Sequence, residues 1–93
     1  MANYKLSEAA KKDLIRIHQY GHIKFGEALA DSYFNSFFDQ FKKIASQPYL
    51  YPAVDHVREG YRRCVHGVDS IYYRIHPGHI EIIRIIGRQD FQL

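Results

Sequence analysis

The sequence predicts an α+β domain in which a hairpin of two helices packs on one face of a mainly antiparallel sheet. Two long segments with apolar residues at helical spacing fill the first half of the chain, and three short segments rich in Ile, Val and Tyr fill the second half. A short alternating segment precedes the first helix. The predicted order is therefore β-α-α-β-β-β, in a single domain spanning residues 1–93.

The first strand and first helix are predicted from residues 3–24. Residues 3–6 alternate in polarity and are expected to join the edge of the sheet. Ser7 is the predicted N-cap, because its side-chain oxygen can accept a hydrogen bond from a free N–H of the first turn. The helix should run from Glu8 to about Lys24. Its apolar stripe follows steps of three and four residues and consists of Ala10, Leu14, Ile17, Gly21 and Phe25.

The second helix should run from about Glu27 to Ser46. Gly26 breaks the helical pattern before it, and Pro48 disfavours α geometry at the preceding residue and ends it. So short a link predicts an antiparallel hairpin. The face packed on the sheet carries Ala30, Tyr33, Phe34, Phe37, Phe38, Phe41, Ile44 and Ala45. The acidic residues expected on the solvated helix faces are Asp13, Glu27, Asp31 and Asp39.

Three strands are predicted at residues 58–65, 69–76 and 79–86, separated by breaks that contain Gly. Their connections are too short for crossover helices, so we expect an antiparallel meander. The last strand has apolar residues at both alternating sets of positions. Ile80, Ile82 and Ile86 belong to one set, and Ile83 and Ile85 belong to the other. That pattern predicts a central strand or one with both faces covered.

The composition limits the classes of function. A net charge of +3 and a pI of about 9.1 suit an acidic partner, but they do not indicate an arm that binds nucleic acid by itself. The single cysteine, Cys64, excludes an internal disulfide and is expected to be a small buried hydrophobe. His18 and His22 lie one helical turn apart and are expected to be exposed rather than metal-binding. We expect no cofactor, no membrane association and a cytoplasmic location.

The distribution of the cations points to the strands. All six lysines lie at or before Lys43, whereas six of the seven arginines lie at or after Arg58. Arginine presents a planar fork to carboxylates and stacks on aromatic rings, whereas lysine is a solvated point charge. The strand half is therefore the predicted recognition surface. The alternative is that Arg62 and Arg63 are solvated charges that protect an edge strand.

Six segments, in this order and spacing, resemble the ParE branch of the RelE/ParE family of bacterial toxins. The resemblance covers nearly the whole chain, and the segments that carry it are Leu6-Ser7-Glu8-Ala9-Ala10 with Asp13-Leu14, Phe25-Gly26, Arg58-Glu59-Gly60-Tyr61-Arg62-Arg63, Ile71-Tyr72-Tyr73-Arg74, Ile82-Ile83-Arg84-Ile85-Ile86, and Arg88-Gln89-Asp90.

This resemblance implies the toxin of a type II toxin–antitoxin system, with the associated growth inhibition and plasmid stabilisation. Toxins of the ParE type poison DNA gyrase and are neutralised by direct binding of a cognate ParD-like antitoxin. The first alternative is a RelE-like endoribonuclease that cuts messenger RNA on the ribosome. The second is a non-toxic relative that keeps antitoxin binding, because Gly87 stands where such toxins often carry a His and the tail beyond Asp90 is short.

Binding rather than catalysis is the expected mode of action. RNA cleavage needs a proton donor and a proton acceptor. The resemblance implies that nuclease members of the family place a catalytic Tyr or His in the tail, where this chain offers only Phe91, which can stack but cannot transfer a proton. The predicted antitoxin-binding residues, which would meet an acidic segment or an added strand, are Arg58, Tyr61, Arg62, Arg63, Tyr73, Arg74 and Arg84. The predicted residues for target binding and toxicity are Arg84, Arg88, Gln89, Asp90 and Phe91.

Overall fold

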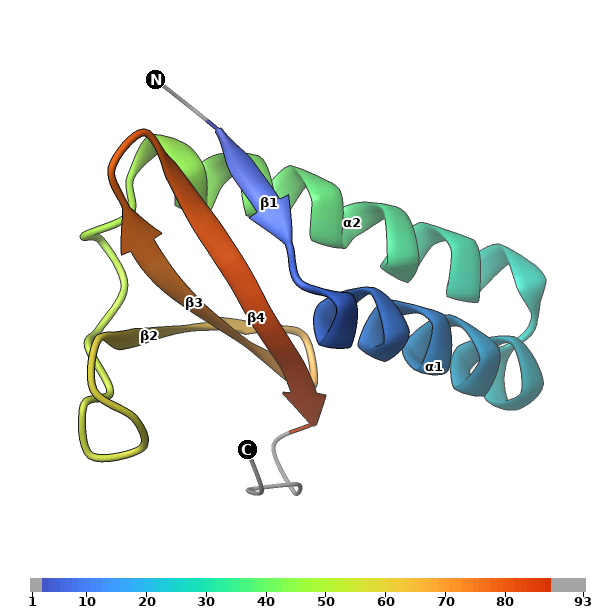
Figure 1. The fold of residues 1–93 in the computed structure, drawn as a ribbon. Coiled ribbons are helices and arrows are strands. Elements are labelled where there is room, and N and C mark those ends of the chain that lie inside the picture. Colours follow the sequence, from blue (N-terminus) through green and yellow to red (C-terminus); the bar gives the residue numbers. More distant parts are fainter. Residues whose placement is uncertain (1–2, 88–93) are drawn as a thin grey trace.

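The computed structural model describes residues 3–87 and confirms the predicted α+β architecture. The two helices cover one face of a four-stranded sheet, and their joined ends project past it (Figure 1). Strand order is β1-β4-β3-β2, with β1 parallel to β4 and the other pairs antiparallel. The elements are β1 (Tyr4–Leu6), α1 (Glu8–Phe25), α2 (Glu27–Ser46), β2 (Tyr61–His66), β3 (Asp69–His76) and β4 (His79–Gly87).

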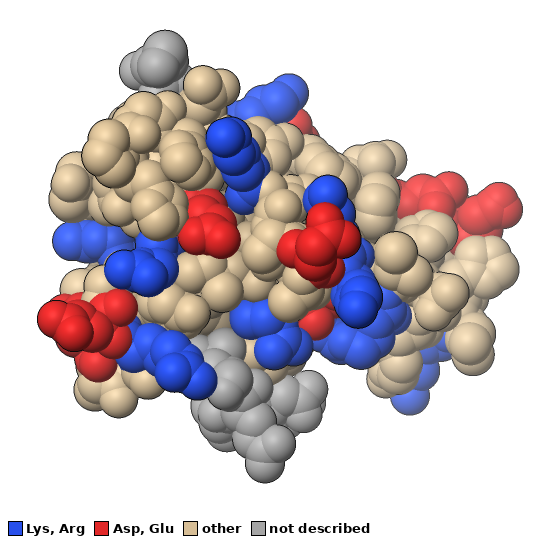
Figure 2. Space-filling view, viewed as in Figure 1, with Lys and Arg blue, Asp and Glu red and all other residues tan. Residues whose placement is uncertain are grey.

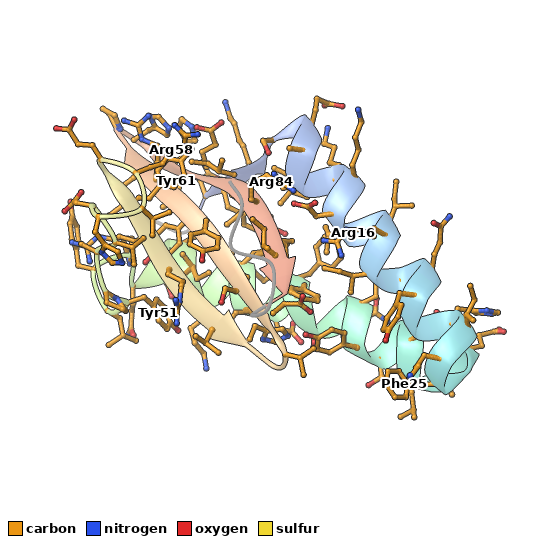
Figure 3. All side chains as sticks on the ribbon, turned by 90° about the horizontal axis from the view of Figure 1, so that it is seen from below. Arg16, Phe25, Tyr51, Arg58, Tyr61 and Arg84 are labelled. Carbon is orange, nitrogen blue, oxygen red and sulfur yellow. The ribbon has the colours of Figure 1, made fainter. Side chains whose placement is uncertain are left out.

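The helix boundaries arise from local chemistry, as predicted. The Ser7 hydroxyl oxygen accepts from the N–H of Ala10 at 3.0 Å and so caps α1. Gly26, at φ +91°, ends α1 and leads directly into α2. Phe25 is a correction, because it is 59% exposed rather than part of the buried stripe. It lies at the projecting end of the hairpin, beyond the reach of the sheet (Figure 3).

The core lies between the hairpin and the sheet. Each large aliphatic or aromatic side chain buried there contributes about 1.5–3 kcal/mol through removal of apolar surface from water. α1 supplies Ala10, Leu14 and Ile17, and α2 supplies Phe37, Phe41, Ile44 and Ala45. The sheet supplies Cys64, Ile71, Tyr73, Ile80, Ile82 and Ile85. Cys64 is 1% exposed, as predicted, and burial raises the pKa of its thiol.

A β-bulge in β4 changes which side chains of this strand lie on the same face of the sheet. Tyr72 of β3 lies opposite Arg84, but the next residue, Tyr73, lies opposite Ile82, so Ile83 is an extra residue in β4. One extra residue moves every later side chain to the other face.

The bulge explains why isoleucine occurs at both even-numbered and odd-numbered positions of β4. Ile80, Ile82 and Ile85 all belong to the core against the helices, whereas Ile86 packs with Val54 and Tyr72 on the opposite face. The prediction that β4 is central is confirmed, since it lies between β1 and β3. The predicted grouping of Ile86 with Ile80 and Ile82 was wrong, because strict alternation does not hold across a bulge.

The β2–β3 turn packs closely under α2. A Cβ placed on Gly67, which has φ +58°, would lie 2.7 Å from the ring and the hydroxyl of Tyr33. That hydroxyl lies 3.0 Å from the carbonyl oxygen of His66 and 2.7 Å from Oδ2 of Asp69. Any side chain at residue 67 would therefore displace Tyr33 from both of these polar partners.

Replacing Gly67 with Ala should lower the free energy of unfolding by about 3 kcal/mol, because it adds this clash to the cost of a left-handed backbone. Gly78→Ala is the matched control. Gly78 has φ +83° with nothing within 4 Å of an added Cβ, so only the backbone cost of about 1 kcal/mol applies. Urea denaturation of both variants measures the difference, and equal losses would contradict this packing.

Candidate partner-binding face

The sheet face opposite the helices carries an ordered set of polar side chains. Residues paired directly across neighbouring strands share a face, which places Tyr61, Arg74, Glu81 and Lys5 in one row across all four strands. Figure 3 looks onto the sheet from below, with Tyr61 and Arg84 labelled. We call this surface the open face, and its polar and exposed members are Lys5, Tyr61, Arg63, Val65, Arg74, His76, His79 and Glu81.

The centre of the open face is apolar. Val54, Tyr72 and Ile86 are 5%, 6% and 4% exposed and form a second, smaller cluster, against which Tyr61 packs. Val54 reaches this cluster because the chain before β2 pairs with its edge, through a bridge between Ala53 and Arg62. The three side chains of this cluster are therefore already covered within the chain, and the apolar groups that the open face exposes are Val65, which is 46% exposed, and the partly exposed Tyr61.

Two predicted residues, Arg63 and Arg74, are available on the open face. Arg74 is exposed and Arg63 is half-buried. A Cβ added to Gly60 would lie 3.4 Å from Nε and Nη2 of Arg74, so the absence of a side chain at Gly60 leaves room for this guanidinium. Arg58, which is also exposed, lies beside Tyr61 in Figure 3. The structure thus brings Arg58, Tyr61, Arg63 and Arg74 to one region.

Arg62 and Tyr73 point away from the open face. Arg62 donates from Nη1 to the carbonyl oxygen of Tyr51 at 2.6 Å, and its guanidinium carbon lies 5.0 Å from the ring centroid of Tyr49. Tyr73 is fully buried and donates to the carbonyl oxygen of Pro48 at 2.6 Å. Burial raises the pKa of this phenol. The assignment of Tyr73 to a binding surface is therefore corrected, because its hydroxyl and ring belong to the core.

Arg84 is held by a buried carboxylate of α1. Asp13 is 4% exposed and accepts from Arg84 Nε at 2.8 Å, from Arg84 Nη2 at 3.1 Å and from the N–H of Ile85 at 2.9 Å. The hydrogen bond to Asp13 is the main cause of a raised pKa at Arg84. The prediction that Asp13 is solvated was wrong. Asp13 lies three residues after Ala10 and four residues before Ile17, on the same side of the helix. This spacing in the sequence could have indicated that Asp13 faces the core.

A polar cluster joins α2 to the end of the β2–β3 hairpin. The Ser36 hydroxyl donates to the carbonyl oxygen of Tyr33 at 2.6 Å, which leaves its oxygen to accept from His66 Nε2 at 2.7 Å. The His66 ring stacks on Tyr33 at 5.6 Å between centroids. Burial lowers the pKa of His66 from its ordinary value of 6.5, against an opposing effect of the Asp69 charge.

Other predicted features can be placed more briefly. His18 is hydrogen-bonded to Asp31 at 2.7 Å and is one-third exposed, whereas His22 is exposed. Within residues 3–87, no group of three or more His, Cys, Asp or Glu could hold a metal ion. No helix in that range is long and apolar enough to span a membrane. Arg88, Gln89, Asp90 and Phe91 lie outside the described residues.

Charge of one sign does not dominate the surface drawn in Figure 2. Lys and Arg side chains there are interspersed with Asp and Glu. A continuous basic stripe is the usual mark of a nucleic-acid-binding face, and this view does not have one. Individual arginines such as Arg63 and Arg74 are better suited to a protein partner that carries carboxylates.

Comparison with known proteins gives a coherent set of relatives. A family model described as the ParE toxin of type II toxin-antitoxin system, parDE, matches residues 4–90. Toxin ParE1 of Caulobacter vibrioides is 34% identical over 86 residues, which cover 92% of this chain and 88% of that protein. Toxin ParE1 of Mycobacterium tuberculosis is 28% identical over 86 residues, covering 91% and 88% of the two chains.

Solved structures show the same fold. A chain of the structure titled chromosomal ParDE TA system from P. aeruginosa matches with a TM-score of 0.80 and 20% identity, covering 94% of this chain and 96% of that one. A conserved hypothetical protein of Helicobacter pylori matches with a TM-score of 0.53 and 13% identity, covering 99% and 100%. At these identities the likeness shows the fold alone.

The half-buried His66 should make the free energy of unfolding fall on acidification. Its folded-state pKa lies below the unfolded value of 6.5, so the unfolded chain binds more protons as the pH drops through 6.5. The free energy of unfolding should therefore decrease between pH 7.5 and 5.5, and His66→Gln should reduce that decrease. His22→Gln, at an exposed position, is the control. Denaturation curves at the two pH values measure the effect, and an unchanged pH slope in His66→Gln would contradict it.

Proposed function

Because the chain belongs to the ParE toxin family of type II toxin–antitoxin systems, we propose that it inhibits DNA gyrase and is neutralised by direct binding of a cognate ParD-like antitoxin. We further propose that it acts by binding rather than by catalysis, in the cytoplasm. Growth inhibition and plasmid stabilisation would follow from this activity.

The observation that carries the antitoxin proposal is the arrangement of the open face. One face of the sheet is occupied by the helical hairpin, and the other presents Arg63 and Arg74 around the apolar cluster of Val54, Tyr72 and Ile86. An amphipathic antitoxin segment could place apolar side chains over the exposed Val65 and the partly exposed Tyr61, and carboxylates beside the two guanidinium groups. Such a segment can be disordered when free and fold on docking.

Only some of the predicted arginines are assigned to antitoxin binding. Arg62 and Arg84 already have intramolecular partners, in Tyr51 and Asp13 respectively. Arg63 and Arg74 are therefore the arginines that we assign to the antitoxin, together with Tyr61, whereas the role of Arg58 stays a prediction. The target-binding role of Arg84 and of residues 88–91 stays a prediction.

A supercoiling assay with purified gyrase tests the toxic activity. The protein should block supercoiling or trap cleaved DNA, and adding the product of the neighbouring gene should restore normal activity. Undisturbed gyrase together with cleaved messenger RNA on translating ribosomes would reject gyrase inhibition in favour of the RelE-like nuclease. Tight antitoxin binding without any growth arrest would indicate the non-toxic relative.

Removing the open-face arginines should weaken antitoxin binding. Arg63→Ala and Arg74→Ala should each raise Kd about tenfold, because a lost charge-assisted hydrogen bond costs about 1.5 kcal/mol or more. Lys42→Ala removes one positive charge from an exposed position on α2 and should leave Kd within about twofold. Titration calorimetry of the four proteins with the antitoxin provides the comparison. Wild-type affinity in both arginine variants would exclude these residues from the interface.

A further inference from the structure

The outer edge of β4 is paired by a strand over only part of its length. β1 pairs with β4 in parallel, from Tyr4 opposite Ile80 to Leu6 opposite Ile82. β1 then ends and the chain turns into α1 at Ser7. Among residues 3–87, no strand lies beside the outer edge of β4 from Ile83 to Gly87, so its backbone groups need other partners.

Groups from Ser7 and from α1 take the place of the missing strand. The N–H of Ser7 donates to the carbonyl oxygen of Ile82 at 2.9 Å, and the Ser7 hydroxyl donates to that of Ile83 at 2.7 Å. Asp13 Oδ2 accepts from the N–H of Ile85 at 2.9 Å, and Arg16 Nη2 donates to the Ile85 carbonyl oxygen at 3.0 Å. Together, Ser7, Asp13 and Arg16 form what we call the edge clasp.

The edge clasp also determines where Arg84 points. Arg84 lies opposite Tyr72, on the open-face side of β4, yet its guanidinium reaches the carboxylate of Asp13, which belongs to the helix on the other face. The side chain therefore passes around the edge of β4, just after the bulge at Ile83. Figure 3 shows Arg84 and Arg16 on the side of β4 that borders α1. Arg84 keeps 33% of its side chain exposed in this position.

We propose that Asp13 is a positioning residue for the target-binding surface of this toxin. Through the edge clasp, it fixes the backbone of β4 at Ile85, two residues before the strand ends at Gly87, and it holds Arg84 in one orientation. The inference rests on the proposed function, in which Arg84 contacts the target. Antitoxin binding, assigned to Arg63 and Arg74 on β2 and β3, does not depend on this orientation.

Asp13→Asn is the direct test, because it keeps the size of the side chain but replaces one accepting oxygen with an NH₂ group that cannot accept from Ile85 or Arg84. Toxicity, measured as growth arrest on induction at matched protein levels, should fall at least tenfold. Antitoxin Kd should stay within about twofold of wild type, and amide hydrogen exchange at Ile85 should accelerate. Asp39→Asn, on the exposed face of α2, should match wild type in all three measurements.

Asp13→Glu provides a second variant in case Asp13→Asn does not fold, since it keeps the carboxylate on a longer side chain. It should show toxicity between those of wild type and Asp13→Asn, with antitoxin binding intact. Parallel loss of toxicity and antitoxin binding in folded protein would overturn the proposal, because it would indicate a general structural role. Full toxicity of Asp13→Asn with accelerated exchange at Ile85 would overturn it too.

The design separates failure of the inference from failure of the proposed function. Growth arrest is measured whatever the molecular target is, so a wild-type protein that stops growth without inhibiting gyrase would reject the proposed target and leave the test of Asp13 valid. A wild-type protein that neither stops growth nor inhibits gyrase would reject both proposals, since there would be no toxic surface to position.

Discussion

The fold depends on a buried carboxylate that joins the first helix to the central strand. Asp13 meets the guanidinium of Arg84 and the N–H of Ile85, and the guanidinium of Arg16 lies 3.5 Å away. A carboxylate removed from water is unfavourable unless such partners are present. Taking one partner from a buried ion pair typically costs about 3–5 kcal/mol. The exposed part of Arg84 reduces that cost here, but the contact still fixes α1 against the part of β4 that β1 does not reach.

Much of the fold follows from short-range patterns in the sequence. The N-cap at Ser7, the break at Gly26 and the turn at Pro77-Gly78 are local signals, and they mark the element boundaries correctly. The aromatic stripe of α2 predicted the core because helical spacing reports one face directly. β2 begins at Tyr61 rather than at residue 58, since the preceding turn is closed by the Asp55 carboxylate, which accepts from the N–H of Gly60.

Other features depend on contacts between distant residues and could not be read from periodicity. The bulge at Ile83 arises from the pairing of β3 with β4, and no residue type in β4 indicates its position. Alternation along a strand places Tyr72 and Tyr73 on opposite faces of the sheet, but it cannot show which of them the helices cover. Arg62 and Arg84 resemble the other strand arginines in sequence. Only their partners, Tyr51 and Asp13, distinguish them.

The two faces of the sheet divide structural from proposed functional roles. On the helix side, charged and aromatic side chains are satisfied within the chain, as Tyr73 and Arg62 illustrate. On the open face, Arg63 and Arg74 lie beside the exposed Val65 and the partly exposed Tyr61, which a partner could cover. The helical hairpin thus supports the sheet from one side and leaves the other for the proposed antitoxin, while the edge clasp holds Arg84, which belongs to the proposed target surface.

Chemical-shift mapping of the labelled protein with its antitoxin tests this division of roles most directly. The account predicts that the amide signals of Tyr61, Arg63 and Arg74 shift strongly on binding, whereas those of Ala10, Leu14 and Ile17, on the buried face of α1, change little. Strong shifts confined to the helical hairpin, with the signals of β2 and β3 unmoved, would contradict the assignment of the open face to the antitoxin.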